Sequence, residues 1–297
     1  MNRQQQEAVE AQGHTAIIAG PGMGKTFTIT KRAQKMLQAG QSVCMVTFTR
    51  ESAREMQVRI GNVDRSKFIC GTFHALAANQ LAESLRVRIM RAGLENFVLR
   101  RAFEQAGEED DELFREIAKE VRDYLAGHKG RSSLSDVASD TWECAKHIML
   151  KERAIAIEAI CALAAELIEQ GKLPLLNCQQ MIVDEFQDVD RHQLQWILSH
   201  AEGGVTITVV GDDDQSIYGF RGSLGTKAFR VLMNRLSPCV IKLSINYRSH
   251  SEITNLASGL IEHNKQRIKK SIKAHRGAGG RISTAIYPDF KAETNDL

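Results

Sequence analysis

The sequence lacks the patterns that would mark a secreted, disulfide-bonded or membrane-bound protein. Its six cysteines lie far apart, with no C-x-x-C pair and no nearby histidine at metal-ligand spacing, so buried thiols in a reducing compartment fit best. The N-terminus has no apolar stretch typical of a signal peptide, and the most apolar helical stretch, 154–168, is interrupted by Glu158 and Glu166. We therefore expect a cytoplasmic protein that does not enter a membrane.

A strong excess of charge of one sign is also absent. The formal net charge of +3 over 297 residues is too small to indicate a nucleic-acid partner, so such a partner has to be inferred from local residues. A basic stretch runs from Lys265 to Lys273. Exposed helix ends often have this composition, and contacts with the phosphates of duplex DNA are the alternative.

What the sequence does contain is an alternation of short apolar runs, rich in β-branched residues, with segments of helical pattern. This alternation predicts a parallel sheet covered by helices. Between His74 and Gln180 no comparable run recurs, and long helix-forming stretches predict a mostly helical insertion. The expected strands are 16–18, 43–48, 68–72, 181–183, 205–210 and 240–243, and the expected helices of the insertion are 94–106, 112–126 and 141–170.

A glycine-rich segment follows the first apolar run and precedes a helix-compatible segment, 27–37. A strand, a glycine-rich turn and a helix N-terminus together direct backbone N–H groups at phosphate oxygens, and Lys25 adds a full positive charge. The strict pattern has glycine where Ala19 stands. The sequence predicts a phosphate-binding loop made of Ala19, Gly20, Pro21, Gly22, Met23, Gly24, Lys25 and Thr26.

Two adjacent carboxylates end the apolar run 181–183. Neighbouring side chains at a strand end diverge, so Asp184 can reach the shell of a Mg²⁺ ion that Thr26 also binds. Glu185 can then orient and deprotonate an attacking water. A solvated acidic turn is the alternative, but the preceding strand and the phosphate loop favour the metal site.

An acidic turn, a glutamine, two aromatic residues and an arginine follow the run 205–210. Because the carboxyl ends of parallel strands share one edge of a sheet, this segment is expected beside the phosphate loop and the two carboxylates. Gln215 would then sense a γ-phosphate, while Tyr218, Phe220 and Arg221 would grip a flat anionic ligand, since aromatic rings stack on bases of any identity. The alternative is that both aromatic rings belong to the core.

Through these and further motifs, the chain resembles the N-terminal half of UvrD/PcrA/Rep-type superfamily 1 DNA helicases. The resemblance extends over almost the whole chain through motifs in the family's order. The supporting segments are 2–9, similar to the Q motif, 47–56 and 71–74, similar to two motifs of the single-strand channel, 184–188, similar to the Walker B motif, and 246–249, similar to the fourth motif.

The resemblance implies ATP and Mg²⁺ as cofactors and assigns roles around the nucleotide. Gln5 would read the adenine edge, Tyr247 would stack on adenine, and Arg248 would reach the γ-phosphate. Phe27 stands where the family usually has an arginine that packs on adenine. With Arg248, the residues expected to take part in hydrolysis are Lys25, Glu185 and Gln215.

The partner that the resemblance implies is single-stranded DNA, including junctions between single and double strands. Phe48 would contact a base, and Thr72 and His74 would meet the DNA backbone. Arg50-Glu51 stands where the family commonly has Asn-Lys, and Phe220 where it commonly has tryptophan. The choice of DNA over RNA as the partner rests on this resemblance alone, because stacking on base faces does not distinguish deoxyribose from ribose.

The implied fold is a RecA-like P-loop NTPase core of residues 1–75 and 180–297, with an α-helical insertion subdomain of residues 76–179. The implied activity is ATP hydrolysis coupled to 3′ to 5′ movement along DNA. We find no segment that resembles the family's last two motifs, which lie on a second RecA-like lobe with an arginine finger. We therefore expect the chain alone to hydrolyse ATP poorly, unless a second polypeptide supplies that lobe.

Two other interpretations stay open. The chain is a nucleotide-gated module that binds single-stranded DNA or a protein partner without unwinding anything, or it is a generic P-loop kinase or GTPase. The last interpretation leaves Gln5, Phe220 and Tyr247 without a role, so it is the least favoured.

Overall fold

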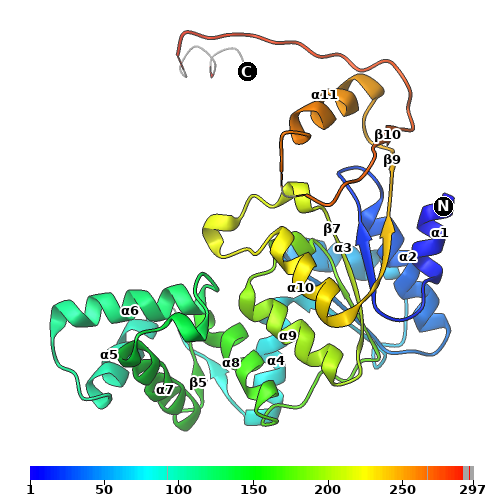
Figure 1. The fold of residues 1–297 in the computed structure, drawn as a ribbon. Helices are drawn as coiled ribbons and strands as arrows, with labels where there is room; N and C mark the ends of the chain where they lie inside the picture. The colour runs from blue at the N-terminus through cyan, green and yellow to red at the C-terminus, as the bar shows by residue number, and fades with distance from the viewer. Residues whose placement is uncertain (92, 266, 290–293, 295–297) are drawn as a thin grey trace.

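A parallel sheet of six strands lies at the centre of the computed structural model, which describes residues 1–91, 93–265, 267–289 and 294 (Figure 1). The strand order is β3-β2-β6-β7-β1-β8, and all neighbours run parallel. The predicted parallel α/β fold and its six strands are confirmed. The strands are β1 (Thr15–Ile18), β2 (Val43–Thr47), β3 (Phe68–Thr72), β6 (Gln180–Val183), β7 (Thr206–Gly211) and β8 (Cys239–Lys242).

Both faces of the sheet are buried, which explains why its strands are continuous apolar runs. Successive side chains of a strand point to opposite faces. Ala16 and Ile18 of β1 therefore join one buried cluster, whereas Ile17 joins the cluster on the other face. Cys44 and Met45 of β2 divide between the two faces in the same way.

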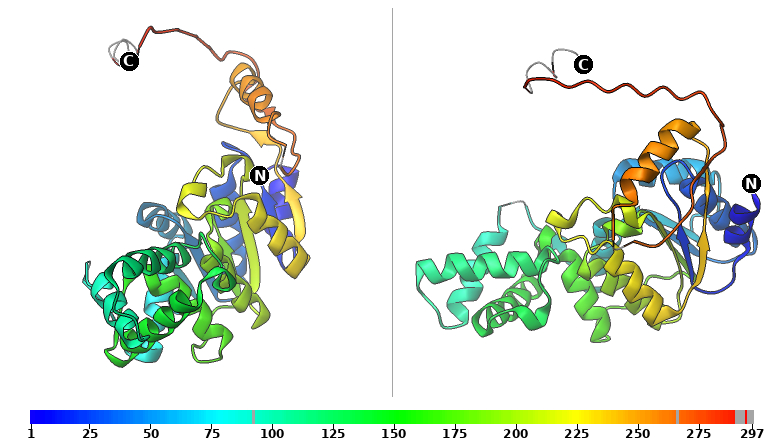
Figure 2. Two further views of the ribbon diagram at one scale, coloured as in Figure 1. Left: turned by 60° about the vertical axis from the view of Figure 1, so that its left-hand side comes forward. Right: turned by 45° about the horizontal axis from the view of Figure 1, so that its top comes forward.

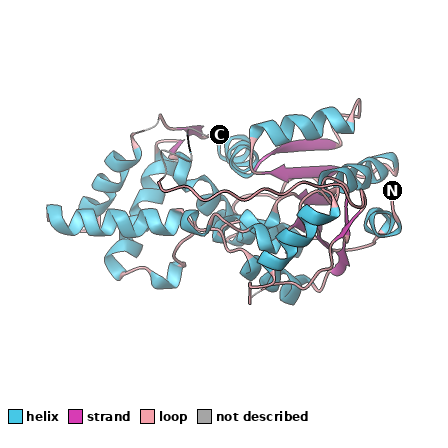
Figure 3. Cartoon of the chain, turned by 90° about the horizontal axis from the view of Figure 1, so that it is seen from above, coloured by secondary structure: helices cyan, strands magenta, loops and turns pink. Residues whose placement is uncertain are grey.

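Helices cover both faces (Figure 3). α1, α2 and α3 pack on the face that includes Ile17, and α4, α9 and α10 pack on the other. The helices next to the sheet are α1 (Arg3–Glu10), α2 (Lys25–Gln38), α3 (Arg50–Ile60), α4 (Phe73–Leu85), α9 (Arg191–Glu202) and α10 (Thr226–Leu236).

The chain between β3 and β6 is mostly helical, as predicted, and projects to one side of the sheet (Figures 1 and 2). Its buried residues, such as Phe103 and Trp142, belong to the same cluster as the sheet face that includes Ala16. The subdomain limits of 76 and 179 stay a prediction. The further elements are β4 (Arg88–Ile89), α5 (Glu95–Gln105), α6 (Asp111–Leu125), a 3-10 turn (Arg131–Ser133), α7 (Asp136–Lys151), β5 (Ala154–Ile155), a second 3-10 turn (Ile157–Ala159) and α8 (Ile160–Glu169).

The predicted continuous helix 141–170 is wrong. α7 ends at Lys151, and Arg153 has a left-handed backbone with a φ of 51°. The next two residues form β5, which pairs in parallel with β4. No glycine or proline marks this break in the sequence, so pairing with a distant segment outweighs local helix propensity here.

The last part of the described chain lies apart from the insertion, at the top of Figure 1. Strands β9 (Ile245–Asn246) and β10 (Lys273–Ala274) pair in parallel on either side of α11 (Ser251–Ile261). Three single 3-10 turns complete the list of elements: Phe186–Asp188, Asp213–Gln215 and Gly219–Arg221.

All six cysteines are free thiols. Their spacing predicted buried thiols. Cys44, Cys161 and Cys178 are buried and Cys70 and Cys144 are partly buried, but Cys239 is exposed, so the prediction is wrong for Cys239. In the part of the chain that the structure describes, no helix is both long enough and apolar enough to cross a membrane.

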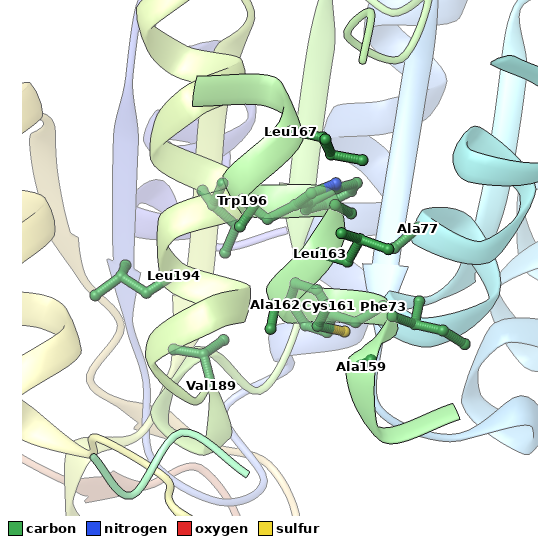
Figure 4. Packing of buried hydrophobic residues seen from close by; sticks show 14 of the residues in the cluster. Phe73, Ala77, Ala159, Cys161, Ala162, Leu163, Leu167, Val189, Leu194 and Trp196 are labelled. Atoms are coloured by element: carbon green, nitrogen blue, oxygen red, sulfur yellow. The ribbon is translucent and has the colours of Figure 1, made fainter. Parts of the chain in front are cut away.

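Trp196 of α9 packs against α4 and α8 (Figure 4). Its ring meets the ring of Phe73 edge-on, with 6.0 Å between the centroids. Its Nε1 donates a hydrogen bond of 2.9 Å to Oε1 of Gln80. Leu163 and Leu167 of α8 lie next to it in Figure 4. Trp196 is only 1% exposed. The contacts through which it joins the three helices are therefore shielded from solvent.

Trp196→Ala is expected to lower the free energy of unfolding by about 3–5 kcal/mol, because it leaves a cavity and removes the donor to Oε1 of Gln80. Urea unfolding followed by circular dichroism measures the change. The control is Leu260→Ala on α11, whose side chain is 75% exposed, and which should change the free energy by less than about 0.5 kcal/mol. A loss below about 1 kcal/mol for Trp196→Ala would contradict the packing role.

Candidate functional site

The loop between β1 and α2 has the backbone shape of an anion-binding turn. Gly22 and Gly24 have left-handed φ angles of 69° and 80°. A Cβ on Gly22 would lie 2.6 Å from Cβ of Arg248, and one on Gly24 would lie 2.8 Å from Nε2 of Gln5. No side chain caps the N-terminus of α2, which begins at Lys25. The loop therefore needs both glycines and leaves the helix N-terminus available to an anion.

The other residues of this loop are held from several directions. The N–H of Ala19 donates to the end of β7 at 3.0 Å. The N–H of Gly20 donates to Sδ of Met23 at 3.0 Å, and the carbonyl of Pro21 accepts from Nδ2 of Asn246 at 2.8 Å. The predicted phosphate loop is thus tied to β7 and β9 as well as to its own strand.

The two carboxylates at the end of β6 differ in burial, and the divergence of their side chains stays a prediction. Asp184 is buried, and Glu185 has a left-handed backbone with a φ of 48°. Nζ of Lys25 lies 2.8 Å from Oε2 of Glu185, an ion pair across the site. Thr26, in the first turn of α2, is half-buried. A positive φ in a non-glycine residue is uncommon and often occurs at functional sites.

The two carboxylates have opposite pKa shifts. Burial raises the pKa of Asp184 to about 7, and the negative charge of Glu185 adds to the rise. Burial also raises the pKa of Glu185, but the charge of Lys25 and the hydrogen bonds from Gln187 and Lys25 outweigh it and keep this pKa below its ordinary value. Glu185 is therefore an ionised base, beside a carboxyl group that is only partly ionised near pH 7.

A pocket of about 550 Å³ opens next to the N-terminus of α2. The carboxamide of Gln5 is fixed there, because its Oε1 accepts from the N–H of Asn2 at 3.1 Å and its Nε2 donates to the carbonyl of Met23 at 3.4 Å. Two aromatic rings, Phe27 and Tyr247, supply flat apolar walls. The pocket is lined by Met1, Asn2, Gln5, Gly24, Phe27 and Tyr247. Its shape and chemistry fit a planar heterocycle whose phosphates extend along the glycine-rich loop.

β9 holds Tyr247 and Arg248 against the phosphate loop. The N–H of Tyr247 donates to the carbonyl of Gly22 at 2.8 Å, and Oδ1 of Asn246 accepts from the N–H of Arg248 at 2.9 Å. The side chain of Arg248 is exposed, so its guanidinium is free to approach a ligand. The structure therefore brings together the residues predicted around a nucleotide.

The segment after β7 lies beside the phosphate loop, as predicted. Nε2 of Gln215 donates to Oδ2 of Asp212 at 2.7 Å, and the same oxygen would lie 3.7 Å from a Cβ on Gly20. The N–H of Asp212 donates to Oε1 of Gln187 at 3.0 Å, and Nε2 of Gln187 donates to Oε2 of Glu185 at 2.9 Å. Gln215 is thus joined by hydrogen bonds to the ion pair of the site.

The aromatic residues of this segment are not part of the core. Tyr218 is 38% and Phe220 is 72% exposed. The guanidinium of Arg221 lies 5.4 Å from the centroid of the first ring and 5.5 Å from that of the second. The alternative that both rings are core residues is therefore wrong, and the loop presents two rings and a cation to the solvent.

Three further candidates lie where β2 and β3 end. Phe48 is half-buried, and its ring packs edge-on against Phe73 at 5.3 Å between centroids. Oγ1 of Thr72 caps α4 by accepting from the N–H of Ala75 at 3.2 Å, whereas His74 is exposed. Phe48 and Thr72 thus have structural contacts of their own. All three lie at the same edge of the sheet as the phosphate loop.

Comparison with known proteins identifies the family. A sequence model described as the UvrD/REP helicase N-terminal domain matches residues 1–229. The chain belongs to this family. The resemblance seen in the motifs is confirmed, and the parallel sheet with its covering helices agrees with the RecA-like lobe that it implies.

Several curated helicases are similar to this UvrD/REP family chain. DNA helicase II of Escherichia coli (strain K12) is 29% identical over 319 residues, which cover 95% of this chain and 43% of that protein. ATP-dependent DNA helicase PcrA of Leuconostoc citreum is 25% identical over 95% of this chain and 42% of its own length. ATP-dependent DNA helicase srs2 of Schizosaccharomyces pombe is 27% identical over 100% of this chain and 38% of its own length. The chain spans less than half the length of each.

Three residues that sequence analysis did not single out support the site of this UvrD/REP family chain. Gln187 bridges Glu185 and the segment after β7, and Asn246 ties β9 to the phosphate loop. Asn2 caps α1, and its Nδ2 donates to the hydroxyl of Tyr247 at 2.9 Å. All three stand in segments that resemble family motifs, and Asn2 has a local signal as well, because asparagine followed three residues later by glutamine is a capping-box pattern.

Asp184→Asn is expected to stabilise the metal-free protein near pH 8 by roughly 1–3 kcal/mol. The pKa of this carboxyl is raised from 3.8 to about 7 on folding, so wild-type stability falls as the pH rises through this window. Asparagine does not titrate, and its Oδ1 can still accept from the N–H of Glu185. Urea unfolding in EDTA near pH 5 and pH 8 measures the difference, and an equal gain at both pH values would contradict this burial effect.

Proposed function

We propose that this chain is the ATP-binding part of a DNA helicase that couples ATP hydrolysis to 3′ to 5′ movement along single-stranded DNA. One observation carries the proposal: hydrogen bonds join Lys25, Glu185, Gln187, Asp212 and Gln215 in a continuous path. The segment at the end of this path also presents the exposed aromatic rings. A change at a bound phosphate can therefore reach the residues that would hold DNA.

ATP fits the pocket and loop together. The adenine base would lie between Phe27 and Tyr247, with its edge toward the carboxamide of Gln5, and its phosphates would lie along the loop of residues 19–26. The exposed guanidinium of Arg248 has reach to a γ-phosphate, since its Cβ lies at the loop. Lys25 would exchange its partner Glu185 for phosphate oxygens when the nucleotide binds.

Mg²⁺ fits the same site. The hydroxyl of Thr26 and the carboxylate of Asp184 are the oxygen ligands that this ion prefers. When bound, the ion neutralises the charge that develops on the phosphates. A cation would also counteract the effect of burial on the pKa of Asp184, because it stabilises the ionised carboxylate. Glu185, already ionised, would orient the attacking water and take its proton.

Single-stranded DNA fits the exposed loop. The rings of Tyr218 and Phe220 would stack on bases, and Arg221 would add charge and a flat surface. His74 is exposed at the next strand end and would meet the DNA backbone, with Thr72 beside it. Phe48 would contact a base through the exposed part of its ring. Junctions between single and double strands are the proposed natural substrate.

A second candidate function is a nucleotide-gated subunit that needs a partner lobe for hydrolysis. One feature of α11 favours it: three apolar side chains of this helix, Ile253, Leu256 and Leu260, are 41%, 61% and 75% exposed. Their spacing of three and four residues places them on one face. Such a face is typical of an interaction surface, and a second RecA-like lobe, in the same or another polypeptide, would cover it. A cytoplasmic location is proposed with either function and is supported by the six free thiols.

We expect the purified 297-residue chain to hydrolyse ATP at less than about 1 s⁻¹, and oligo-dT to raise the rate. The measurement is steady-state ATP turnover with and without oligo-dT. Lys25→Ala and Glu185→Gln are the controls, because each removes one side of the ion pair, and both should abolish the stimulated rate.

Each outcome of this experiment has a separate meaning. Stimulated turnover that both substitutions abolish would support the helicase proposal. Absent turnover, with nucleotide and DNA still bound, would support the subunit that needs a partner lobe. A chain that binds neither ligand would overturn both proposals, and unstimulated turnover above about 1 s⁻¹ would overturn the expectation of slow hydrolysis.

Tyr218→Ala and Phe220→Ala are each expected to weaken binding of oligo-dT by about 1–3 kcal/mol through lost stacking, and to leave nucleotide binding unchanged. Fluorescence anisotropy of a labelled oligonucleotide measures the affinity. Ile217→Ala is the matched control, since its side chain is 70% exposed in the same loop and is not aromatic. An equal loss from the control, or no loss from either ring, would contradict base stacking by this loop.

A further inference from the structure

Three successive aspartates after β7 are buried against one lysine from far along the chain. Nζ of Lys270 lies 2.6 Å from Asp212, 2.7 Å from Asp213 and 2.6 Å from Asp214, measured to a carboxylate oxygen of each. None of these four side chains is more than 1% exposed. In this conformation Lys270 is therefore not available to DNA phosphates, which was one interpretation of the basic stretch.

The neighbours of Lys270 hold the same turn. Nη2 of Arg267 lies 2.8 Å from Oδ2 of Asp214, and the N–H of Ile268 donates to Oδ2 of Asp213 at 2.5 Å. The segment therefore docks on the aspartates through its backbone as well as through two cations. We call residues 267–276 the strap.

Lys270 and Gln215 share one carboxylate. Oδ1 of Asp212 lies 2.6 Å from Nζ of Lys270, and Oδ2 accepts from Nε2 of Gln215 at 2.7 Å. Each partner binds a different oxygen of Asp212. Lys270 therefore orients this carboxylate, and the carboxylate in turn orients the carboxamide of Gln215. Gln187, which binds the N–H of Asp212, continues the path to Glu185.

The other end of the strap contacts the residues proposed to bind the nucleotide. β10 pairs with β9, and the N–H of His275 donates to the carbonyl of Asn246 at 2.8 Å. The rings of His275 and Tyr247 lie 4.9 Å apart between centroids, and Nη1 of Arg276 donates to the carbonyl of Arg248 at 2.9 Å. One segment thus supports both the turn before Gln215 and the strand that precedes Tyr247.

The turn depends on the cation. Oxygen atoms of Asp212, Asp213 and Asp214 all lie within 4.8 Å of one another, and burial makes their mutual repulsion large. Without Lys270 the buried carboxylates would lose the cation that all three contact, which favours their movement into solvent. The same loop continues to Tyr218 and Phe220, so a displaced turn would carry both rings with it.

We propose that Lys270 is a positioning residue for Gln215 and for the aromatic loop that follows it. It fixes Asp212, and Asp212 fixes the carboxamide that would sense the γ-phosphate. The turn of three aspartates then transmits the position of this carboxamide to the loop. This inference rests on the proposed function, because it gives Lys270 a part in the coupling between nucleotide and DNA.

The first test measures coupling with the full chain. Affinity for fluorescein-labelled oligo-dT is compared by anisotropy in Mg²⁺ with ADP and with a non-hydrolysable ATP analogue. We expect the wild-type affinities to differ by about 5- to 150-fold, the usual range for coupled sites. Lys270→Met should bring this ratio to within about twofold of one, while the affinity for ADP changes by less than about threefold.

Lys269→Met is the matched control, since it removes the same charge from an exposed neighbouring position and should leave the ratio unchanged. A ratio in Lys270→Met equal to that of the wild type would overturn the proposal. An equal loss of the ratio in Lys269→Met would also overturn it, because the effect would then follow from surface charge alone.

A second test needs neither ligand. Arg221 is exposed in the aromatic loop, and trypsin cleavage after it gives a fragment of residues 1–221 that mass spectrometry identifies. Lys270→Met should speed its release by about tenfold, because loosened segments are cleaved faster, and Lys269→Met should not. Equal rates in Lys270→Met and the wild type would overturn the proposal. A wild-type chain that binds no nucleotide would instead refute the proposed function, while this test still reports on Lys270.

If Lys270→Met does not fold by circular dichroism, Lys270→Met/Asp213→Asn replaces it in both tests. The double variant removes one carboxylate together with the ammonium, so the net charge of the cluster is kept. Asp212 and Gln215 are unchanged, but the contact between Lys270 and Asp212 is lost. The same ratio and the same cleavage rate are expected as for Lys270→Met, and wild-type values would overturn the proposal.

Discussion

The parallel direction of all six strands is the constraint on which the site depends. In such a sheet the carboxyl ends of the strands meet at one edge, and the segments that follow them are neighbours however far apart they lie in sequence. The phosphate loop follows β1, the carboxylates follow β6, and the aspartate turn follows β7. Since β1 and β6 both adjoin β7 in the strand order, Lys25 and Glu185 can form an ion pair, and Gln187 can bind the turn.

Burial gives these neighbouring groups their chemistry. A carboxylate in a low-dielectric setting is costly without a cation, and the site meets this cost in three different ways. Glu185 pairs with Lys25, Asp184 has a raised pKa of about 7, and the aspartate turn pairs with Lys270. Lys25 would leave Glu185 for the phosphates of a bound nucleotide, whereas no ligand would displace Lys270 from the three aspartates. The ion pair of Glu185 and the carboxyl of Asp184 are thus the parts of the site that a nucleotide and its metal would change.

Local sequence predicted the features that depend on local physics. Ile17 and its neighbours mark a strand buried on both faces, and Gly22 and Gly24 mark a turn that needs positive φ angles. The break after Lys151 was not predictable, because a two-residue pairing with β4 causes it and no breaker residue is present. The packing of Phe48 on Phe73 also depends on a contact between two different strand ends. The burial of Lys270 is the extreme case, since its three partners lie more than fifty positions earlier in the sequence.

The aspartate turn shows why stability and coupling cannot be separated at this position. Three buried carboxylates in one turn are stable only with a cation, so the strap that supplies Lys270 is needed for the fold of the loop. Oδ1 of Asp214 and Nε of Arg267 nevertheless have no hydrogen-bond partner among the described residues, which leaves this ion cluster short of its best arrangement. Because Asp212 is shared between Lys270 and Gln215, a rearrangement of the cluster would move the carboxamide, and a pull on the carboxamide would disturb the cluster. Coupling between two ligand sites requires this kind of reciprocity.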